Sequence, residues 1–282
     1  MERLRFFQIP KTGGTTFTTI LFRQYFWEKI FVFSGNPAED KRKFDALSAS
    51  AKKSIALFTG HMPLVTGIQE ADNAKTITFL RNPINRVKSF CQHASEGKSK
   101  YLLNDFPPES FSLDKFLESG NIELSNFQTR MLLGNNNNAS LYSIENMPAS
   151  QARDAALDIL LNKISYFGLQ EYFDESLIVF STAFNWNMPF YSPKNVGDAQ
   201  KPLKFEEHHL KRIAELNEID IEVYRIAEKQ FISRLEDAAF LDKAKLKRLQ
   251  LINKTFGASL IPAWERISWM INRCSKPLLH SP

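Results

Sequence analysis

Short apolar runs alternate with longer amphipathic stretches over about the first 170 residues of the chain. Four of the runs are rich in β-branched and aromatic residues and have the length of a buried strand. They lie at residues 4–9, 54–59, 76–80 and 166–169. Because helical patterns separate them, the chain is predicted to form a parallel α/β sheet, whose ligands bind beyond the carboxyl ends of the strands.

Apolar residues at helical spacing predict the helices that accompany this sheet. They fall at residues 15–31, 84–95, 113–119, 126–133, 151–164, 173–184, 205–217 and 220–236. The segment from Gly35 to Lys53 is polar and is expected to be a connection, and residues 187–204, rich in Pro, Gly and Lys, are expected to be a loop. No internal repeat or clean linker divides the chain. We therefore expect one domain over residues 1–238 and a basic, amphipathic helical extension over residues 239–282.

Composition places the chain among soluble globular proteins. Its 282 residues can bury a full core, and 43% of them are hydrophobic and 24% charged. The formal net charge is only +5, and the stretch from Leu241 to Lys254 contributes +4 of it, with five basic residues against Asp242. The nearly balanced remainder argues against a nucleic-acid binder. The two cysteines, Cys91 and Cys274, are too few for a disulfide framework, and no Cys/His spacing indicates a metal site.

The end of the chain combines the basic run with an amphipathic pattern. Its apolar residues at helical spacing are Leu260, Trp264, Ile267 and Ile271. Trp beside basic residues suits peripheral contact with a membrane or a partner groove, and the alternative is a helix folded back on the domain. No signal peptide precedes the first strand, and no apolar run approaches the ~20 residues that a membrane span needs. The expected location is therefore the cytoplasm.

The first predicted strand ends in a turn that carries several groups able to bind phosphate. A helix is expected to begin at Thr15 or Thr16, directly after two glycines. Glycines let backbone N–H groups approach an anion, and the helix N-terminus adds unpaired donors and the positive end of its dipole. The candidate phosphate ligands are Lys11, Thr12, Gly13, Gly14, Thr15 and Thr16. The alternative is an ordinary strand-to-helix turn. The loop is not a Walker A motif, since Lys11 precedes the glycines.

Residues 78–90 form the second candidate motif. Arg81 leaves the end of the third predicted strand, and Ser89 lies on the helix that follows. A guanidinium group matches the geometry of a phosphate, and a hydroxyl adds a further donor. An arginine after a strand is commonly just a surface residue. It is the pairing with the first loop that indicates a second phosphate.

Together these motifs resemble sulfotransferases that use 3′-phosphoadenosine 5′-phosphosulfate (PAPS), namely the carbohydrate sulfotransferases of the heparan sulfate 2-O/6-O type and their bacterial relatives. Residues 10–17, Pro-Lys-Thr-Gly-Gly-Thr-Thr-Phe, are similar to the family's 5′-phosphosulfate loop. Residues 81–89 are similar to its 3′-phosphate motif, Arg-Asp-Pro-x-x-Arg-x-x-Ser, with Asn82 where the family often has Asp. Asn removes a charge but keeps the ability to form the turn. Further similar segments lie at residues 126–134, 167–176, 195–202 and 219–224. The first of these faces substrate and cofactor in the family, and in the last Asp220 is a candidate cap for its own helix.

The resemblance implies a P-loop-like three-layer fold with a central parallel sheet flanked by helices. It implies that Lys11 offsets charge on the departing phosphate oxygen, and that Arg81 and Ser89 hold the 3′-phosphate. Lys201 lies in a segment that resembles a loop closing over the nucleotide, so it is a further candidate for a phosphate, with a solvated lysine as the alternative. Golgi members of the family carry an N-terminal membrane anchor. This sequence shows none, which makes a bacterial cytoplasmic enzyme the expectation.

Transfer of a sulfuryl group to a hydroxyl needs a base, and an imidazole titrates near neutral pH. His61, in a Gly-His-x-Pro loop, resembles the Gly-His motif that follows the second strand in bacterial relatives. The alternatives are a structural role for His61, or His93 as the base, because His93 lies near the second motif. His208 and His209 fall on a polar helix and are expected to be solvated.

The expected function is therefore transfer of the sulfuryl group from PAPS to a hydroxyl of a carbohydrate or glycoconjugate. No metal is expected, because lysine and backbone dipoles supply the positive charge. Two alternatives stay open: a nucleotide-dependent, kinase-like phosphotransferase, and a non-catalytic protein that binds PAP or another nucleotide. The identity of the acceptor and the oligomeric state are not indicated by the sequence.

Overall fold

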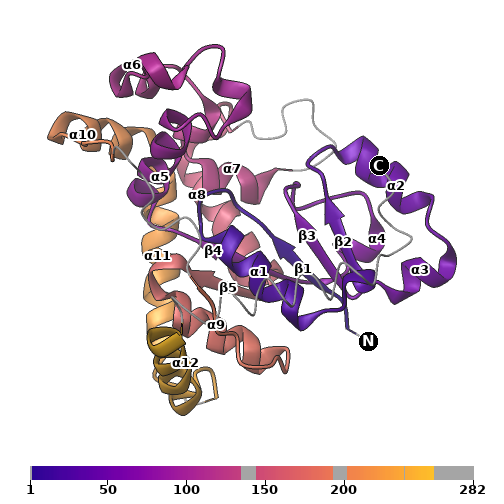
Figure 1. Cartoon of the computed structure of the whole chain (residues 1–282). Helices are drawn as coiled ribbons and strands as arrows, with labels where there is room; N and C mark the ends of the chain where they lie inside the picture. The colour runs from indigo at the N-terminus through magenta and orange to yellow at the C-terminus, as the bar shows by residue number, and fades with distance from the viewer. Residues whose placement is uncertain (1, 135–143, 193–201, 238, 257–282) are drawn as a thin grey trace.

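A single parallel sheet organises the computed structural model of the chain (Figure 1). The structure describes residues 2–134, 144–192, 202–237 and 239–256. The strands are β1 (Leu4–Phe7), β2 (Ile30–Phe33), β3 (Leu57–Gly60), β4 (Lys75–Leu80) and β5 (Tyr166–Leu169). Their order is β2–β3–β1–β4–β5, and every neighbouring pair is parallel. The predicted α/β fold, a central parallel sheet flanked by helices, is confirmed.

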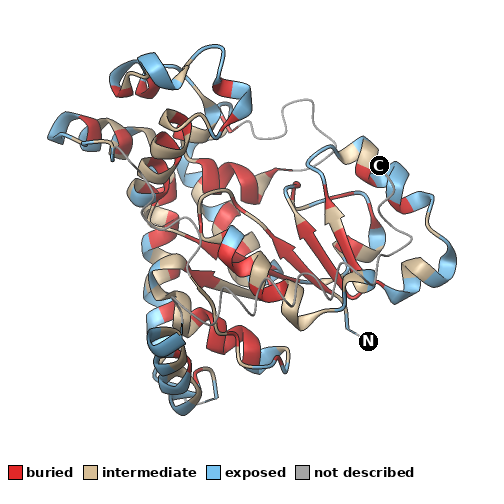
Figure 2. Ribbon diagram, in the orientation of Figure 1, coloured by how far each residue is buried: buried red, intermediate tan, exposed pale blue. Residues whose placement is uncertain are grey.

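Helices cover both faces of the sheet, which gives three layers. Successive side chains of a strand point to opposite faces, so Phe6 of β1 joins one buried cluster and Phe7 joins another. The first cluster includes side chains of α1 (Gly14–Gln24) and α9 (Phe173–Ala183), and the second includes those of α7 (Phe127–Leu133), α8 (Ala149–Asp158) and α11 (Glu218–Arg234). Figure 2 shows the strands buried along the middle of the molecule and the outer helix faces exposed.

The region after α1 differs from the prediction. The helix expected over residues 15–31 ends at Gln24, and Ile30–Phe33 forms the edge strand β2, paired with β3. This run, Ile-Phe-Val-Phe, is uninterruptedly apolar, and such short runs fit a buried strand and a buried helix equally well. The helix prediction extended the α1 stripe through it, and that part of the prediction was wrong.

The segment expected to be a polar connection contains two capped helices. The Asn36 side chain accepts from the Glu39 N–H at the start of α2 (Pro37–Asp45), and the Ser48 side chain accepts from the Ala51 N–H at the start of α3 (Ala49–Ser54). Side-chain acceptors at such positions stabilise helix starts, even where the helices are short and polar. The other helices are α4 (Gln69–Asp72), α5 (Pro83–Ser95), α6 (Leu113–Leu117), α10 (Glu207–Leu216) and α12 (Lys243–Phe256).

Helix α12 is the described part of the predicted C-terminal extension. Leu249 of α12 and Leu241 just before it are buried in the first core cluster, and the Tyr191 N–H donates to Asn253 Oδ1 at 3.0 Å. The amphipathic pattern expected at residues 260–271 lies outside the described residues. Within the described ranges, no helix combines the length and the apolar character that crossing a membrane requires.

The topology brings the predicted motifs to one edge of the sheet. Strands β3, β1 and β4 are neighbours and parallel, so the loops that carry His61, Lys11 and Arg81 emerge side by side. Strands β2 and β3 lie on one side of β1, and β4 and β5 on the other. Ligands of open α/β sheets bind at such a switch in strand order. We refer to the Lys11–Thr16 loop, His61 and Arg81 as the strand-end site.

Candidate active site

The loop between β1 and α1 is tightly turned and strained. Lys11 has a φ of 69° and Gly13 a φ of 91°, both in the left-handed region, which a non-glycine residue adopts only at a cost. A Cβ on Gly14 would lie 2.7 Å from Gln8 Nε2, so the Gln8 side chain would have to shift to admit one. The Thr12 hydroxyl is buried and donates to the Ile9 carbonyl at 2.8 Å, which braces the turn.

The start of α1 has the features of an anion site. Its N-cap is Gly13, which has no side chain to satisfy the first backbone N–H groups of the helix. Thr15, in the first turn, is exposed, whereas Thr16 is buried. Because the first N–H groups of a helix have no partner within it, this helix start and its dipole favour a negatively charged ligand.

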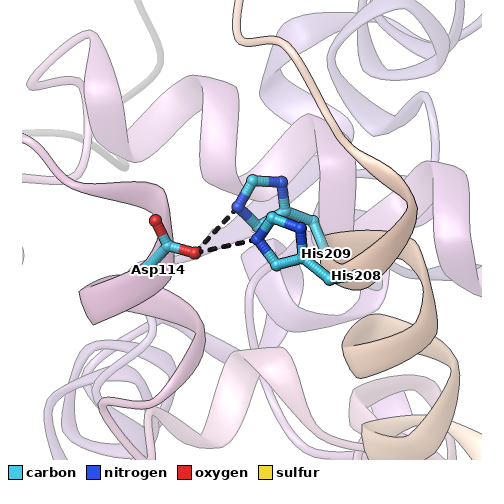
Figure 3. Close-up of side chains that lie close together, drawn as sticks. All are labelled: Asp114, His208 and His209. Atoms are coloured by element: carbon cyan, nitrogen blue, oxygen red, sulfur yellow. Dashed lines mark hydrogen bonds and ion pairs between the residues drawn. The ribbon is translucent and has the colours of Figure 1, made fainter.

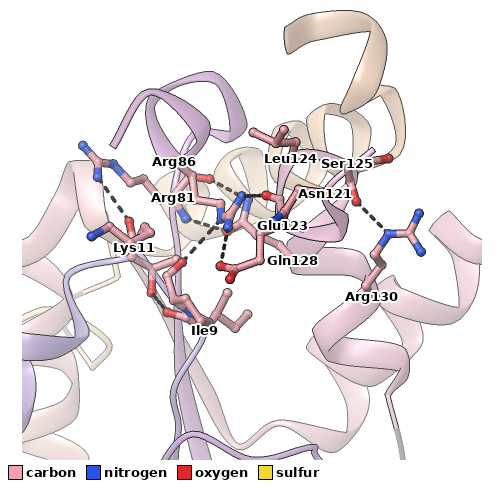
Figure 4. Close-up of polar contacts among 12 residues, drawn as sticks. Ile9, Lys11, Arg81, Arg86, Asn121, Glu123, Leu124, Ser125, Gln128 and Arg130 are labelled. Atoms are coloured by element: carbon pink, nitrogen blue, oxygen red, sulfur yellow. Dashed lines mark hydrogen bonds and ion pairs between the residues drawn. The ribbon is translucent and has the colours of Figure 1, made fainter. Parts of the chain in front are cut away.

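Arg81 meets this loop from the neighbouring strand. Its Nη1 donates to the Lys11 carbonyl at 3.1 Å (Figure 4). Gln128 holds the Arg81 backbone from both sides, accepting from its N–H at 2.9 Å and donating to its carbonyl at 2.8 Å. Arg81 Nε is buried and has no hydrogen-bond partner among the described residues. A buried, unpaired guanidinium nitrogen suits an anionic ligand.

Asn82 and Ser89 complete the second motif on α5. The Asn82 side chain accepts from the Asn85 N–H at 3.2 Å and so caps α5, as expected for an asparagine in place of aspartate. Ser89 lies further along α5 and is half-buried, and its hydroxyl has no hydrogen-bond partner within the described part of the chain. Lys201, the remaining candidate ligand, lies outside the described residues.

The pKa values of both cations in the site, Lys11 and Arg81, are lowered. The pKa of Lys11 is lowered to about 8, first by burial and then by the charges of Arg86 and Arg81. Burial also lowers the pKa of Arg81. A nearby anion would raise these lowered pKa values, so the two cations suit an anionic ligand.

The two candidate bases differ in their surroundings. The pKa of His93, on α5, is lowered to about 4 by burial and then by Lys11 and Lys98. His61 has exposed surface, yet the protein around it lowers its pKa through partial burial, while Glu123 opposes this shift. Gly60, before His61, has a φ of 124°, and a Cβ there would collide with the Phe33 carbonyl oxygen of β2. The position before His61 is thus restricted to glycine by strand packing.

Two residues that the sequence did not single out support the site. Arg86 of α5 is fully buried, with its Nε 3.4 Å from the Pro10 carbonyl, and it is paired with Glu123 (Figure 4). Arg86 occupies the second arginine of the Arg-x-Pro-x-x-Arg pattern, so a signal for it existed. No local signal marks Glu123, because it lies 37 residues away in sequence.

Residues 126–134, which resemble a family segment facing substrate and cofactor, exchange helix caps with α11. The Asn126 side chain accepts from the Ile219 and Asp220 N–H groups at 3.0 and 3.1 Å. The Asp220 carboxylate in turn accepts from the Gln128 and Thr129 N–H groups at 3.0 and 2.7 Å. Asp220 was expected to cap its own helix, but it caps α7 instead. This fixes Gln128, which holds Arg81.

Asp114, His208 and His209 form a second polar cluster, the α6–α10 cluster (Figure 3). One Asp114 oxygen lies 3.1 Å from His208 Nε2 and 3.0 Å from His209 Nε2. His208 is exposed as expected, but the expectation for His209 was wrong, because it is buried. His209 Nδ1 accepts from the Glu206 N–H at 3.0 Å, so its proton sits on Nε2 and faces Asp114. In this tautomer Nε2 has no lone pair to offer a metal, and the three side chains form a hydrogen-bonded group.

Comparison with known proteins gives a distant but consistent similarity. No family model matches the chain. Heparan-sulfate 6-O-sulfotransferase 2 of Gallus gallus is 25% identical over 280 residues, covering 82% of this chain and 67% of its own length. The Homo sapiens protein of the same name is 26% identical, with coverages of 82% and 45%. Heparan-sulfate 6-O-sulfotransferase 1-B of Danio rerio is 23% identical over 286 residues, with coverages of 87% and 70%.

The similarity supports a sulfotransferase family. This chain spans less than half the length of the Homo sapiens and Mus musculus relatives. The five-stranded parallel sheet is consistent with the P-loop-like fold expected of a sulfotransferase. The observed fold is therefore compatible with the family that the sequence similarity supports.

Proposed function

We propose that the protein transfers the sulfuryl group of PAPS to a hydroxyl of a carbohydrate or glycoconjugate. The observation that carries this proposal is the hydrogen bond from Arg81 Nη1 to the Lys11 carbonyl at 3.1 Å. It joins two phosphate motifs that lie 70 residues apart in sequence. A ligand with phosphate groups at two separate positions is what such a pair of motifs would bind, and PAPS carries both a 3′-phosphate and a 5′-phosphosulfate.

The residues present fit this donor. The Lys11–Thr16 loop and the start of α1 would hold the 5′-phosphosulfate, and Arg81 and Ser89 would hold the 3′-phosphate. The unpaired Arg81 Nε and the depressed pKa of Lys11 both indicate cationic groups that a bound anion would stabilise. PAPS supplies the activated sulfuryl group. Lys11 offsets the negative charge that grows on the departing phosphate oxygen.

His61 is the better candidate for the base that takes the proton of the acceptor hydroxyl. A base works best when its pKa lies near the working pH. With a pKa of about 4, His93 is a weak proton acceptor at pH 7. Burial lowers the pKa of His61 as well, but the negative charge of Glu123 opposes this effect, and part of the ring is open to solvent.

The acceptor class rests on the relatives, whose names specify heparan sulfate. The test incubates the protein with radiolabelled PAPS and a panel of glycans. We expect label in at least one glycan, and His61→Ala should lower turnover by about 10²–10⁴-fold with PAP affinity unchanged. His208→Ala, in the α6–α10 cluster, is the matched control and should retain turnover.

Two results would contradict the proposal. Transfer of label from ATP rather than PAPS would indicate a kinase-like phosphotransferase. PAP binding by the wild type without turnover on any glycan would indicate a non-catalytic nucleotide-binding protein.

A further inference from the structure

Arg86 is a fully buried cation next to the donor loop. Its relative exposure is 0%, and its guanidinium lies 4.8 Å from the centre of the Phe127 ring and 5.6 Å from that of Phe90. Its Nε lies 3.4 Å from the Pro10 carbonyl, one residue before Lys11. A buried guanidinium between aromatic rings is costly unless an anion faces it.

Glu123 supplies that anion. Arg86 Nη1 donates to the Glu123 backbone carbonyl, and Arg86 Nη2 lies 3.5 Å from Glu123 Oε2 (Figure 4). Asn121 holds the short helix at Ile122–Leu124 by accepting from the Glu123 N–H at 2.9 Å. The Tyr101 hydroxyl donates to the other carboxylate oxygen. Glu123 therefore fixes Arg86 from a segment remote in sequence from the donor loop.

The donor loop needs such support. Lys11 sits in the left-handed region, and a strained residue keeps its conformation only where its surroundings impose it. Three contacts flank it: Arg86 to the Pro10 carbonyl, Arg81 to the Lys11 carbonyl, and the Thr12 hydroxyl to the Ile9 carbonyl. Of these three, only the first depends on a carboxylate partner that holds the donor in place.

We propose that Glu123 is a positioning residue that, through Arg86, holds the β1–α1 loop in the conformation that receives the sulfuryl donor. The donor that the loop receives rests on the proposed function. The contacts through which Glu123 and Arg86 hold the loop do not. Without the carboxylate, Arg86 keeps its backbone carbonyl acceptors but loses the negative charge of Glu123 beside its guanidinium. Burial, and then the charges of Arg86 and Arg81, already lower the pKa of Lys11, and the loss of the Glu123 carboxylate removes the charge that opposes this shift. The loop should loosen, and PAP affinity should fall with it.

The test measures amide hydrogen exchange in the full-length protein without nucleotide. In Glu123→Gln we expect the amides of residues 11–16 to exchange at least tenfold faster than in the wild type, while those of β4 keep their rates. Glu109→Gln is the matched control, because Glu109 is an exposed carboxylate in the same part of the chain. Wild-type exchange of the loop in Glu123→Gln would overturn the proposal.

A second variant covers the case in which Glu123→Gln loses its cooperative thermal transition. Glu123→Asp keeps the charge but shortens the side chain, so its loop amides should exchange at rates between those of the wild type and those of a loosened loop. Wild-type rates in this variant would contradict the proposal. PAP calorimetry on the same proteins should give an affinity at least tenfold weaker for Glu123→Gln. Because exchange needs no nucleotide, a wild-type protein that failed to bind PAP would refute the proposed function while leaving the test of Glu123 intact.

Discussion

The strand-end site and the α6–α10 cluster are both groups of titratable side chains, yet their charges are balanced differently. In the strand-end site, the cations Lys11 and Arg81 lie near buried Arg86, and the pKa of Lys11 is lowered to about 8. In the α6–α10 cluster, Asp114 faces two histidines, and their hydrogen bonds lower the pKa of its carboxyl. The strand-end site therefore brings like charges together, whereas the side chains of the α6–α10 cluster hydrogen-bond to one another. Like charges that the fold keeps close together are typical of a site that binds an oppositely charged ligand.

Replacing Lys11 should give the largest effect among the tests of this difference between the two groups. Lys11→Met should lower PAPS turnover by about 10²–10³-fold, because it removes the charge that stabilises the departing phosphate oxygen. It should also raise the free energy of unfolding at pH 7 by about 1–3 kcal/mol, since a partly buried charge with a lowered pKa is lost. Initial rates and denaturant unfolding check the two effects. A variant that loses turnover and also has a lower free energy of unfolding would contradict the view that the Lys11 charge serves function at a cost in stability.

Replacing Asp220 should lower the free energy of unfolding instead, because its carboxylate accepts hydrogen bonds from buried N–H groups. Asp220→Ala leaves the Gln128 and Thr129 N–H groups at the start of α7 without their acceptor. We expect the free energy of unfolding to fall by about 2–4 kcal/mol, from two buried groups left unpaired. Denaturant unfolding measures this loss. Unchanged stability would show that the exchange of caps between α7 and α11 contributes little.

Arg81 tests which phosphate each motif holds. Arg81→Met should weaken PAP binding by about 10–100-fold, the range for a lost charge-assisted hydrogen bond, and should weaken AMP binding much less. Competition binding with the two nucleotides gives the ratio. Equal losses for PAP and AMP would place Arg81 at the 5′ end instead of the 3′ end.

Asp114→Asn should have the smallest effect. The side chain is exposed, so we expect the melting temperature to fall by no more than roughly 2 °C, with PAP affinity and turnover unchanged. Addition of Zn²⁺ to the wild type should not raise the melting temperature, because His209 Nε2 carries a proton. Stabilisation by Zn²⁺ that Asp114→Asn abolishes would show that the cluster binds metal after all.

Local patterns were enough to predict that these candidate residues lie at one edge of the sheet. The Lys-Thr-Gly-Gly turn after β1, Arg81 after β4 and His61 after β3 are each marked by neighbours in sequence, and a parallel sheet necessarily brings strand ends to one edge. The edge strand β2 was missed because a four-residue apolar run does not distinguish helix from strand.

The supporting contacts could not be predicted in the same way. Glu123 meets Arg86 across 37 residues, and Asp220 caps α7 from 91 and 92 residues away. Such pairings depend on how helices pack, and residue type alone does not reveal them. Asp220 looked like a cap for its own helix, and His209 looked solvated, because each was judged by its nearest neighbours in the chain.

The central claim is that the strand-end site binds a nucleotide with phosphates at both ends. Calorimetry with PAP on the wild-type protein, between pH 7.5 and pH 9, tests it directly. Lys11 loses its proton as the pH rises through about 8, whereas a bound phosphate would raise its pKa and keep it charged. PAP should therefore bind one per chain at pH 7.5, more tightly than ATP or AMP, and roughly five- to tenfold more weakly at pH 9. Absence of PAP binding, or ATP binding as tightly as PAP, would contradict the account.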